Sequence, residues 1–167
     1  MFTTIEQFIN CWENASQSAV KIFESLTDES LSQEITLGYR SLGRIAWHIV
    51  QTVPEMMGRT GLQVSGLSEG KEVPTDAKTI LESYKKVSKD LSEKIKKEWT
   101  DETLRVEDDM YGEQWPRAKT CLCLIEHQLH HLGQMTVLMR QAHLSVPGIC
   151  GPSKEEWQHF GMEPPTI

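Results

Sequence analysis

The chain lacks long apolar runs and has less basic than acidic charge. No segment reaches the roughly 18 uncharged apolar residues of a membrane span, and the first residues do not form a basic and then apolar leader. We therefore expect a cytoplasmic protein with no membrane partner. There are 17 lysines and arginines against 24 aspartates and glutamates, a net charge of -7. This balance argues against nucleic acid as a partner, because phosphate contacts need a basic patch.

Cysteines are few, and the familiar nucleophile motifs are missing. The four cysteines are Cys11, Cys121, Cys123 and Cys150. Their spacing fits neither a secreted disulfide scaffold nor a paired C-x-x-C zinc site, so we expect reduced and mostly buried thiols. The sequence has no G-x-S-x-G, no glycine-rich phosphate loop and no Cys-His catalytic signature. Chemistry in this chain has to come from another set of residues.

Four segments have the apolar period of a helix, and no segment has the alternation of a convincing strand. The predicted helices span about residues 4–25, 41–57, 76–99 and 116–143. Pro54 should kink or end the second helix. Residues 100–115 indicate a loop or a short hairpin, and Ser153 could cap a short helical turn in the tail.

These segments predict one all-α domain over residues 1–167, folded as a four-helix bundle. The glycine-rich stretch 58–74, which includes Gly58, Gly61, Gly66 and Gly70, is long for a loop between antiparallel neighbours. It favours a crossover between the second and third helices over a simple up-down chain.

Two histidines lie one turn apart in the strongly apolar fourth helix. His127 and His131 are four residues apart, so both imidazoles face the same side. Neutral imidazole is the commonest metal ligand, and the pair therefore indicates a metal site. His48, beside the apolar face of the second helix, is the candidate third ligand. The alternative is that all three are ordinary hydrogen-bonded core histidines.

Two nearby polar residues are candidates for supporting roles. His130 is about 60° from the pair on the helix, so we expect it at the rim of the site or hydrogen-bonded to a ligand. Gln134 is placed to form a hydrogen bond to a ligating histidine or to contact a substrate. The equally good alternative is an ordinary polar residue at the edge of the helix. No residue is assigned a catalytic role from the sequence. His143 and His159 are expected at the surface.

The histidine motifs resemble those of the DinB/YfiT-like superfamily. Residues 41–48, S-L-G-R-I-A-W-H, look like its second-helix motif. Residues 127–134, H-Q-L-H-H-L-G-Q, resemble its H-x-x-H-H-R-G-Q signature, with Leu132 where arginine is usual. The tail 151–157 is also similar. The resemblance covers nearly the whole chain.

This resemblance implies an up-down-down-up bundle, commonly a homodimer, in which His48, His127 and His131 bind zinc or nickel. It implies a small-molecule substrate, because characterised relatives include thiol S-transferases that use bacillithiol or mycothiol, and a mycothiol-dependent isomerase. We expect a transferase in which the metal activates a low-molecular-weight thiol as thiolate. The departure at Leu132 affects an inherited substrate contact more than the metal.

Two further functions remain open from the sequence. One is a metal-dependent hydrolase that uses a metal-activated hydroxide. It would need a carboxylate base, and Glu126 points away from His127. The other is a binding module without catalysis, in which the metal joins the second and fourth helices.

Overall fold

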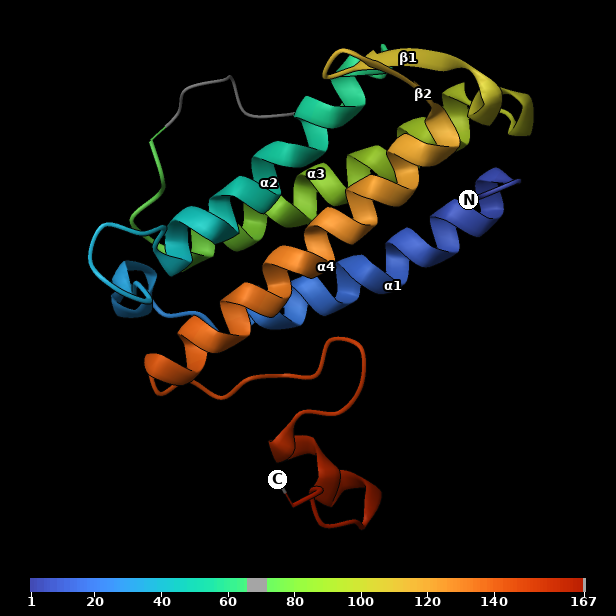
Figure 1. Ribbon diagram of the computed structural model, residues 1–167. Helices are drawn as coiled ribbons and strands as arrows, with labels where there is room; N and C mark the ends of the chain where they lie inside the picture. The colour runs from blue at the N-terminus through green and yellow to red at the C-terminus, as the bar shows by residue number, and fades with distance from the viewer. Residues whose placement is uncertain (66–71, 167) are drawn as a thin grey trace.

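The computed structural model of the chain is a bundle of four long helices with a small hairpin at one end and a helical tail at the other (Figure 1). The structure describes residues 1–65 and 72–166. The helices are α1 (Ile5–Glu24), α2 (Leu42–Arg59), α3 (Ala77–Glu98) and α4 (Arg117–Gln141). The predicted four-helix bundle is confirmed.

The helices run up, down, down and up (Figure 1). Around the bundle, α1 contacts α3 and α4, and α2 contacts the same two helices, so α1 and α2 lie on a diagonal. The parallel pair α2 and α3 requires a connection that returns along the bundle, which is the predicted crossover. Of its glycines, Gly66 and Gly70 lie outside the described residues.

The core lies between all four helices and is rich in large side chains. Fully buried residues include Phe8, Trp12, Phe23, Trp47 and Tyr84. Three helices begin at a side-chain cap, because Thr4, Ser41 and Asp76 each accept a hydrogen bond from the backbone N–H three residues later. These caps agree with the predicted helix starts.

The second helix does not end at Pro54, where the sequence predicted a kink or an end. It continues to Arg59 with Pro54 inside it. A proline inside a helix costs about 3 kcal/mol. Met56 and Met57, which follow Pro54, are 4% and 0% exposed, and each buried methionine stabilises by about 1.5–3 kcal/mol. Burial of this last turn therefore offsets the cost.

The segment before α4 is a hairpin, the second of the two structures predicted there. After the 3-10 helix η2 (Asp101–Arg105), strand β1 (Glu107–Met110) pairs antiparallel with β2 (Glu113–Pro116). Tyr111 and Gly112 form the turn with φ of +60° and +89°, as in a type I′ turn. Arg117 Nε and Nη2 donate to Asp108 at 2.8 and 3.1 Å and hold the hairpin on α4.

Two short 3-10 helices complete the structure. η1 (Glu29–Ser32) packs against α2. η3 (Lys154–Phe160) begins after Ser153, whose backbone N–H donates to Glu156 Oε2 at 3.0 Å, while its hydroxyl bonds to none of the described residues. Arg140 on α4 pairs with Glu155 on η3. None of the described helices is both long and apolar enough to cross a membrane.

The cysteine prediction is partly wrong. All four thiols are free, as expected, but only Cys121 is buried and Cys123 is half-buried. Cys11 and Cys150 are exposed. Cys11 precedes the fully buried Trp12 and lies on the outer face of α1, because neighbouring helix positions point about 100° apart.

Candidate metal centre

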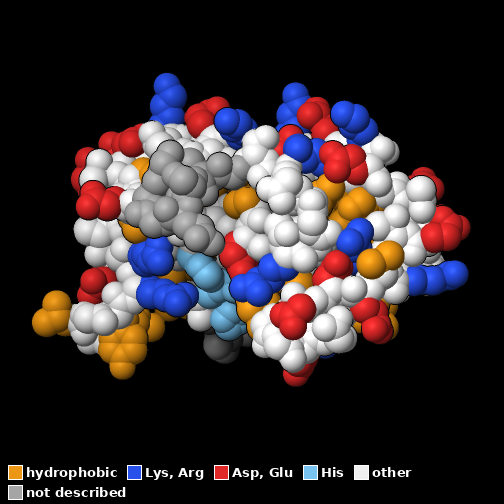
Figure 2. All heavy atoms as spheres, turned by 90° about the horizontal axis from the view of Figure 1, so that it is seen from above, with side chains coloured by type: hydrophobic (Ala, Val, Ile, Leu, Met, Phe, Trp, Pro, Cys, Tyr) orange, Lys and Arg blue, Asp and Glu red, His pale blue; other side chains and the backbone are white. Residues whose placement is uncertain are grey.

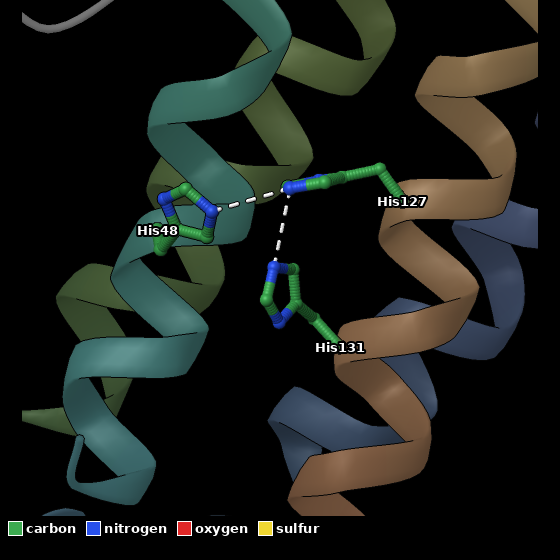
Figure 3. Close-up of side chains that lie close together, drawn as sticks. All are labelled: His48, His127 and His131. Carbon is green, nitrogen blue, oxygen red and sulfur yellow. Dashed lines mark hydrogen bonds between the residues drawn. The ribbon is translucent and has the colours of Figure 1, made fainter. Parts of the chain in front are cut away.

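Three histidines converge between α2 and α4. His48 comes from the middle of α2, and His127 and His131 come from successive turns of α4 (Figure 3). The two helices pack side by side and run in opposite directions. The three imidazole rings therefore point into one space from two sides. The structure brings together the three residues that the sequence predicted.

The ring nitrogens are close together. His48 Nε2 lies 3.3 Å from His127 Nε2, and His127 Nε2 lies 3.2 Å from His131 Nε2. The planes of the His48 and His131 rings are 87° apart, and those of His127 and His131 are 80° apart. The rings are steeply inclined to one another, and the Nε2 atoms of His48 and His131 both face His127 Nε2 (Figure 3).

This donor set fits a divalent transition metal. A zinc–nitrogen distance of about 2.0–2.1 Å in a tetrahedral site places two ligating nitrogens about 3.3 Å apart. The two shortest distances between the histidine nitrogens agree with that value. One ligand atom from each of the three residues lies within 4.8 Å of those of the other two. The group could hold one metal ion.

The environment keeps the three imidazoles neutral. Burial lowers the pKa of His48 to about 4, and nearby His131 and His127 add to the effect. Burial is also the main cause that lowers the pKa values of His127 and His131. The positive charge of Arg40 contributes in the same direction at all three sites. Neutral imidazole is the form that ligates a metal, so the site is ready at neutral pH.

Gln134 fixes the orientation of His131. His131 Nδ1 lies 2.7 Å from Gln134 Oε1. An amide oxygen only accepts, so Nδ1 carries the proton and Nε2 keeps its lone pair for the centre. Gln134 Nε2 then donates to His130 Nε2 at 3.1 Å. Gln134 therefore has the predicted hydrogen bond to a candidate ligand, whereas His130 is exposed, bonds to Gln134 and lies at the rim of the site.

His127 has a polar atom that the protein leaves without a partner. Its Nδ1 is buried and bonds to none of the described residues. Its Nε2 faces the Nε2 atoms of both other histidines. No described side chain bonds to His127 Nδ1 as Gln134 bonds to His131 Nδ1. A cation shared by the three lone pairs would hold it in place.

A carboxylate on the same helix face as His48 is not among the residues predicted from the sequence. Glu55 lies seven residues after His48, two turns along the same face of α2. The pKa of His127, lowered mainly by burial, is raised slightly by Glu55, which acts on it through space. The seven-residue spacing from His48 is the signal in the sequence that indicates Glu55.

Glu55 is held by two partners. Tyr111 Oη donates to its Oε2 at 2.8 Å, and Arg59 Nε donates to its Oε1 at 2.7 Å. The Arg59 guanidinium also lies 4.3 Å from the centre of the Tyr111 ring. The hairpin turn thereby reaches α2, and no spacing in the sequence indicates this contact across 56 residues.

The centre is open to solvent on one side. Figure 2 shows histidine side chains in a hollow of the surface, with lysine or arginine side chains on both sides of it. His131 itself is 6% exposed, while His48 and His127 are half-buried. Small molecules can therefore reach the site.

Other residues singled out from the sequence lie away from the centre. Leu132, which replaces the usual arginine, is fully buried in the core. It does not contribute a polar contact to the site. His143 and His159 are exposed, as predicted.

Comparisons with known proteins agree with this structure. The family model described as the DinB family matches residues 1–166. The chain is 47% identical over 167 residues to the uncharacterized protein YrdA of Bacillus subtilis (strain 168), and the match covers 100% of both.

Two solved structures are similar. A DinB-like protein from Bacillus cereus ATCC 10987 is 48% identical, with a TM-score of 0.87 over 89% of this chain and 99% of that one. YjoA, a DinB-like protein from Bacillus subtilis, has a TM-score of 0.68 at 17% identity over 86% of this chain and 97% of that one, and it shows the likeness of fold alone.

Proposed function

The chain belongs to the DinB family, and from that premise we propose that it is an enzyme that depends on a divalent transition metal. His48, His127 and His131 would hold the ion. The convergence of three imidazole nitrogens from two helices carries this proposal. Imidazole ligands suit zinc and nickel. Three protein ligands leave a position for an outside molecule, which is typical of catalytic rather than structural zinc.

The reaction we propose is transfer of a low-molecular-weight thiol, of the bacillithiol kind, to a small electrophile. When bound, such a metal lowers the pKa of a ligating thiol or water and supplies a nucleophile at neutral pH. The thiol gives its proton to water, its sulfur bonds to the electrophilic carbon, and the leaving group departs with the bonding electron pair. None of the described cysteines belongs to the histidine group, so the thiol has to come from outside the chain.

Two features of the chain support this reaction. Gln134 keeps the His131 lone pair directed at the centre, so that ligand needs no reorientation. The buried walls of the site keep the imidazoles neutral. The centre is therefore preorganised to take up a metal and an outside ligand together.

The test is thiol transfer to a chromogenic aryl halide by zinc-loaded or nickel-loaded protein. We expect turnover that needs bacillithiol or cysteine, that a chelator abolishes, and that His131→Gln reduces at least about 100-fold. A Gln141→Asn variant, changed at the far end of α4, is the control and should keep full activity. Thiol transfer that continues unchanged in metal-free protein or in His131→Gln would contradict the proposal.

Glu55 favours a second candidate, a metal-dependent hydrolase. The sequence supplied no carboxylate base, but Glu55 acts electrostatically on His127 from the same face of α2 that carries His48. In a hydrolase, it would accept a proton from water as that water attacks an ester or amide. Turnover of a p-nitrophenyl ester without any thiol, lost in Glu55→Gln, would favour this function. Ester turnover that Glu55→Gln leaves unchanged would exclude Glu55 as the base.

A further inference from the structure

A pocket of about 560 Å³ opens beside the histidines. Its walls come from the loop before α2, the start of α2 and the second half of α4, and His131 forms part of its lining. Ligand pockets for small molecules are typically about 300–1,000 Å³. The space is therefore large enough for a small organic molecule in contact with the metal centre.

The walls of this pocket are mainly apolar. Ile35, Ile45, Val137 and Leu138 line it together with the Tyr39 ring. Three of these side chains, Ile35, Tyr39 and Val137, are 49–66% exposed. Apolar side chains gathered around one hollow beside a polar centre are typical of a ligand site.

Arg40 is the cation of this pocket. Three of the other arginines, Arg59, Arg117 and Arg140, each pair with a carboxylate. Arg44 and Arg105, like Arg40, belong to none of the ion pairs among the described residues, but neither of them lines this pocket. No carboxylate among the described residues lies within ion-pairing distance of Arg40. In a protein of net charge -7, a guanidinium without an internal partner at a pocket wall is available to an anion from outside.

We propose that the pocket binds a small organic carboxylate, with its apolar part against the Ile45 and Leu138 wall and its carboxylate on Arg40. One guanidinium matches one carboxylate, to which it can donate two parallel hydrogen bonds. The inference rests on the proposed function in so far as this molecule is a substrate of the metal centre. The pocket would then place the substrate beside His131.

Binding of hexanoate is compared with binding of hexanamide, which has the same apolar chain and no charge. Both are titrated into wild type, Arg40→Gln, Arg40→Lys and Arg105→Gln, each metal-free and zinc-loaded, by NMR. Arg105 is an exposed arginine on η2, at the other end of the bundle, and serves as the control. In the metal-free series, tighter binding of hexanoate cannot come from ligation of its carboxylate by zinc.

We expect hexanoate to bind wild type about tenfold or more tightly than hexanamide in both series. A hydrogen bond between charged groups changes the affinity by about that factor. Arg40→Gln should lose this preference, Arg40→Lys should keep part of it, and Arg105→Gln should keep it whole. Equal binding of the two ligands, or a preference that survives in Arg40→Gln, would overturn the proposal. So would hexanoate binding that weakens as protein concentration rises, because a second copy of the chain would then occupy the pocket.

The two proposals fail separately. If zinc does not bind but hexanoate selectivity depends on Arg40, the metal-dependent function is wrong and the pocket is supported. If zinc binds through the three histidines but selectivity is absent, the pocket is wrong and the metal centre is unaffected.

Discussion

At the scale of single residues, Gln134 has the most specific effect on the centre. Its amide bonds to His131 on one side and His130 on the other. Replacing it with a side chain that cannot accept a hydrogen bond leaves His131 Nδ1 without that partner. The ring is then free to turn, and either nitrogen can carry the proton.

We therefore expect Gln134→Leu to weaken zinc affinity about 10–100-fold. Competition with a chromogenic chelator measures the change. Gln141→Leu, at the exposed last position of α4, is the matched control and should bind zinc like the wild type. Equal affinity in all three proteins would mean that Gln134 does not orient the ligand.

The sequence predicts residues of the site only where helix geometry alone relates them. His127 and His131 are one turn apart on one helix, so the pair was found directly. His48 could be proposed from its place beside an apolar face, but its meeting with the pair depends on how α2 packs on α4. Glu55 could be related to His48 by its seven-residue spacing, but its contact with Tyr111 depends on a hairpin that no local pattern places. Arg40 could not be predicted, because its role depends on the position of a loop.

At the scale of elements, the start of α2 depends on close packing with η1. A Cβ added at Gly43 would lie 3.0 Å from Leu31 Cβ and 3.1 Å from the Leu31 carbonyl oxygen. The loop between them carries Tyr39 and Arg40 of the pocket. This contact therefore positions one wall of the pocket.

Gly43→Ala should destabilise the protein. Alanine in place of glycine in a helix contributes up to about 1 kcal/mol, but overpacking costs about 1–3 kcal/mol, so the clash decides the sign. In urea unfolding, the free energy of unfolding of Gly43→Ala should be about 1 kcal/mol lower than that of the wild type. Gly58→Ala on the same helix has no atom within 4 Å of its new Cβ, and it should stabilise by up to about 1 kcal/mol. Stabilisation by both variants would show that η1 moves away without cost.

The tail helix η3 should detach from α4 in acid. The ion pair with Arg140 lowers the pKa of Glu155 to about 2, and backbone bonds from Gly148 and Ser153 lower the pKa of Glu156. Glu155 therefore stabilises the docked tail fully above pH 4.5, its ordinary pKa, and this contribution is lost as pH falls toward 2.

The NMR signal of the Trp157 indole N–H reports on docking, because Trp157 lies on η3. It should change between pH 4.5 and 2. Glu155→Gln should lack the part of the change that comes from the Arg140 pair. An unchanged signal down to pH 2 would show that other contacts hold the tail.

Helices and their capped starts were predictable because apolar period and capping are local. Other features depend on the rest of the molecule. Pro54 stays inside α2 because the following methionines are buried. The hairpin could be distinguished from a loop only by contacts such as Arg117 with Asp108.

At the scale of the whole molecule, the up-down-down-up order brings α2 and α4 side by side, although 57 residues lie between Arg59 at the end of α2 and Arg117 at the start of α4. This is possible because α1 and α2 lie on a diagonal, so that α2 has the place beside α4 that α3 would have in a simple up-down-up-down bundle. The net charge of -7 and the open histidine centre are the features on which our proposal of a small-molecule ligand rests.

The metal content of the purified protein tests the central claim most directly. Wild type and His48→Ala, both made without a polyhistidine tag, are dialysed against zinc and then buffer and analysed by mass spectrometry. We predict one zinc ion per wild-type chain and a loss of most of it in His48→Ala, because only two ligands remain. Wild-type protein without zinc, or His48→Ala with as much zinc as the wild type, would contradict the three-histidine metal centre.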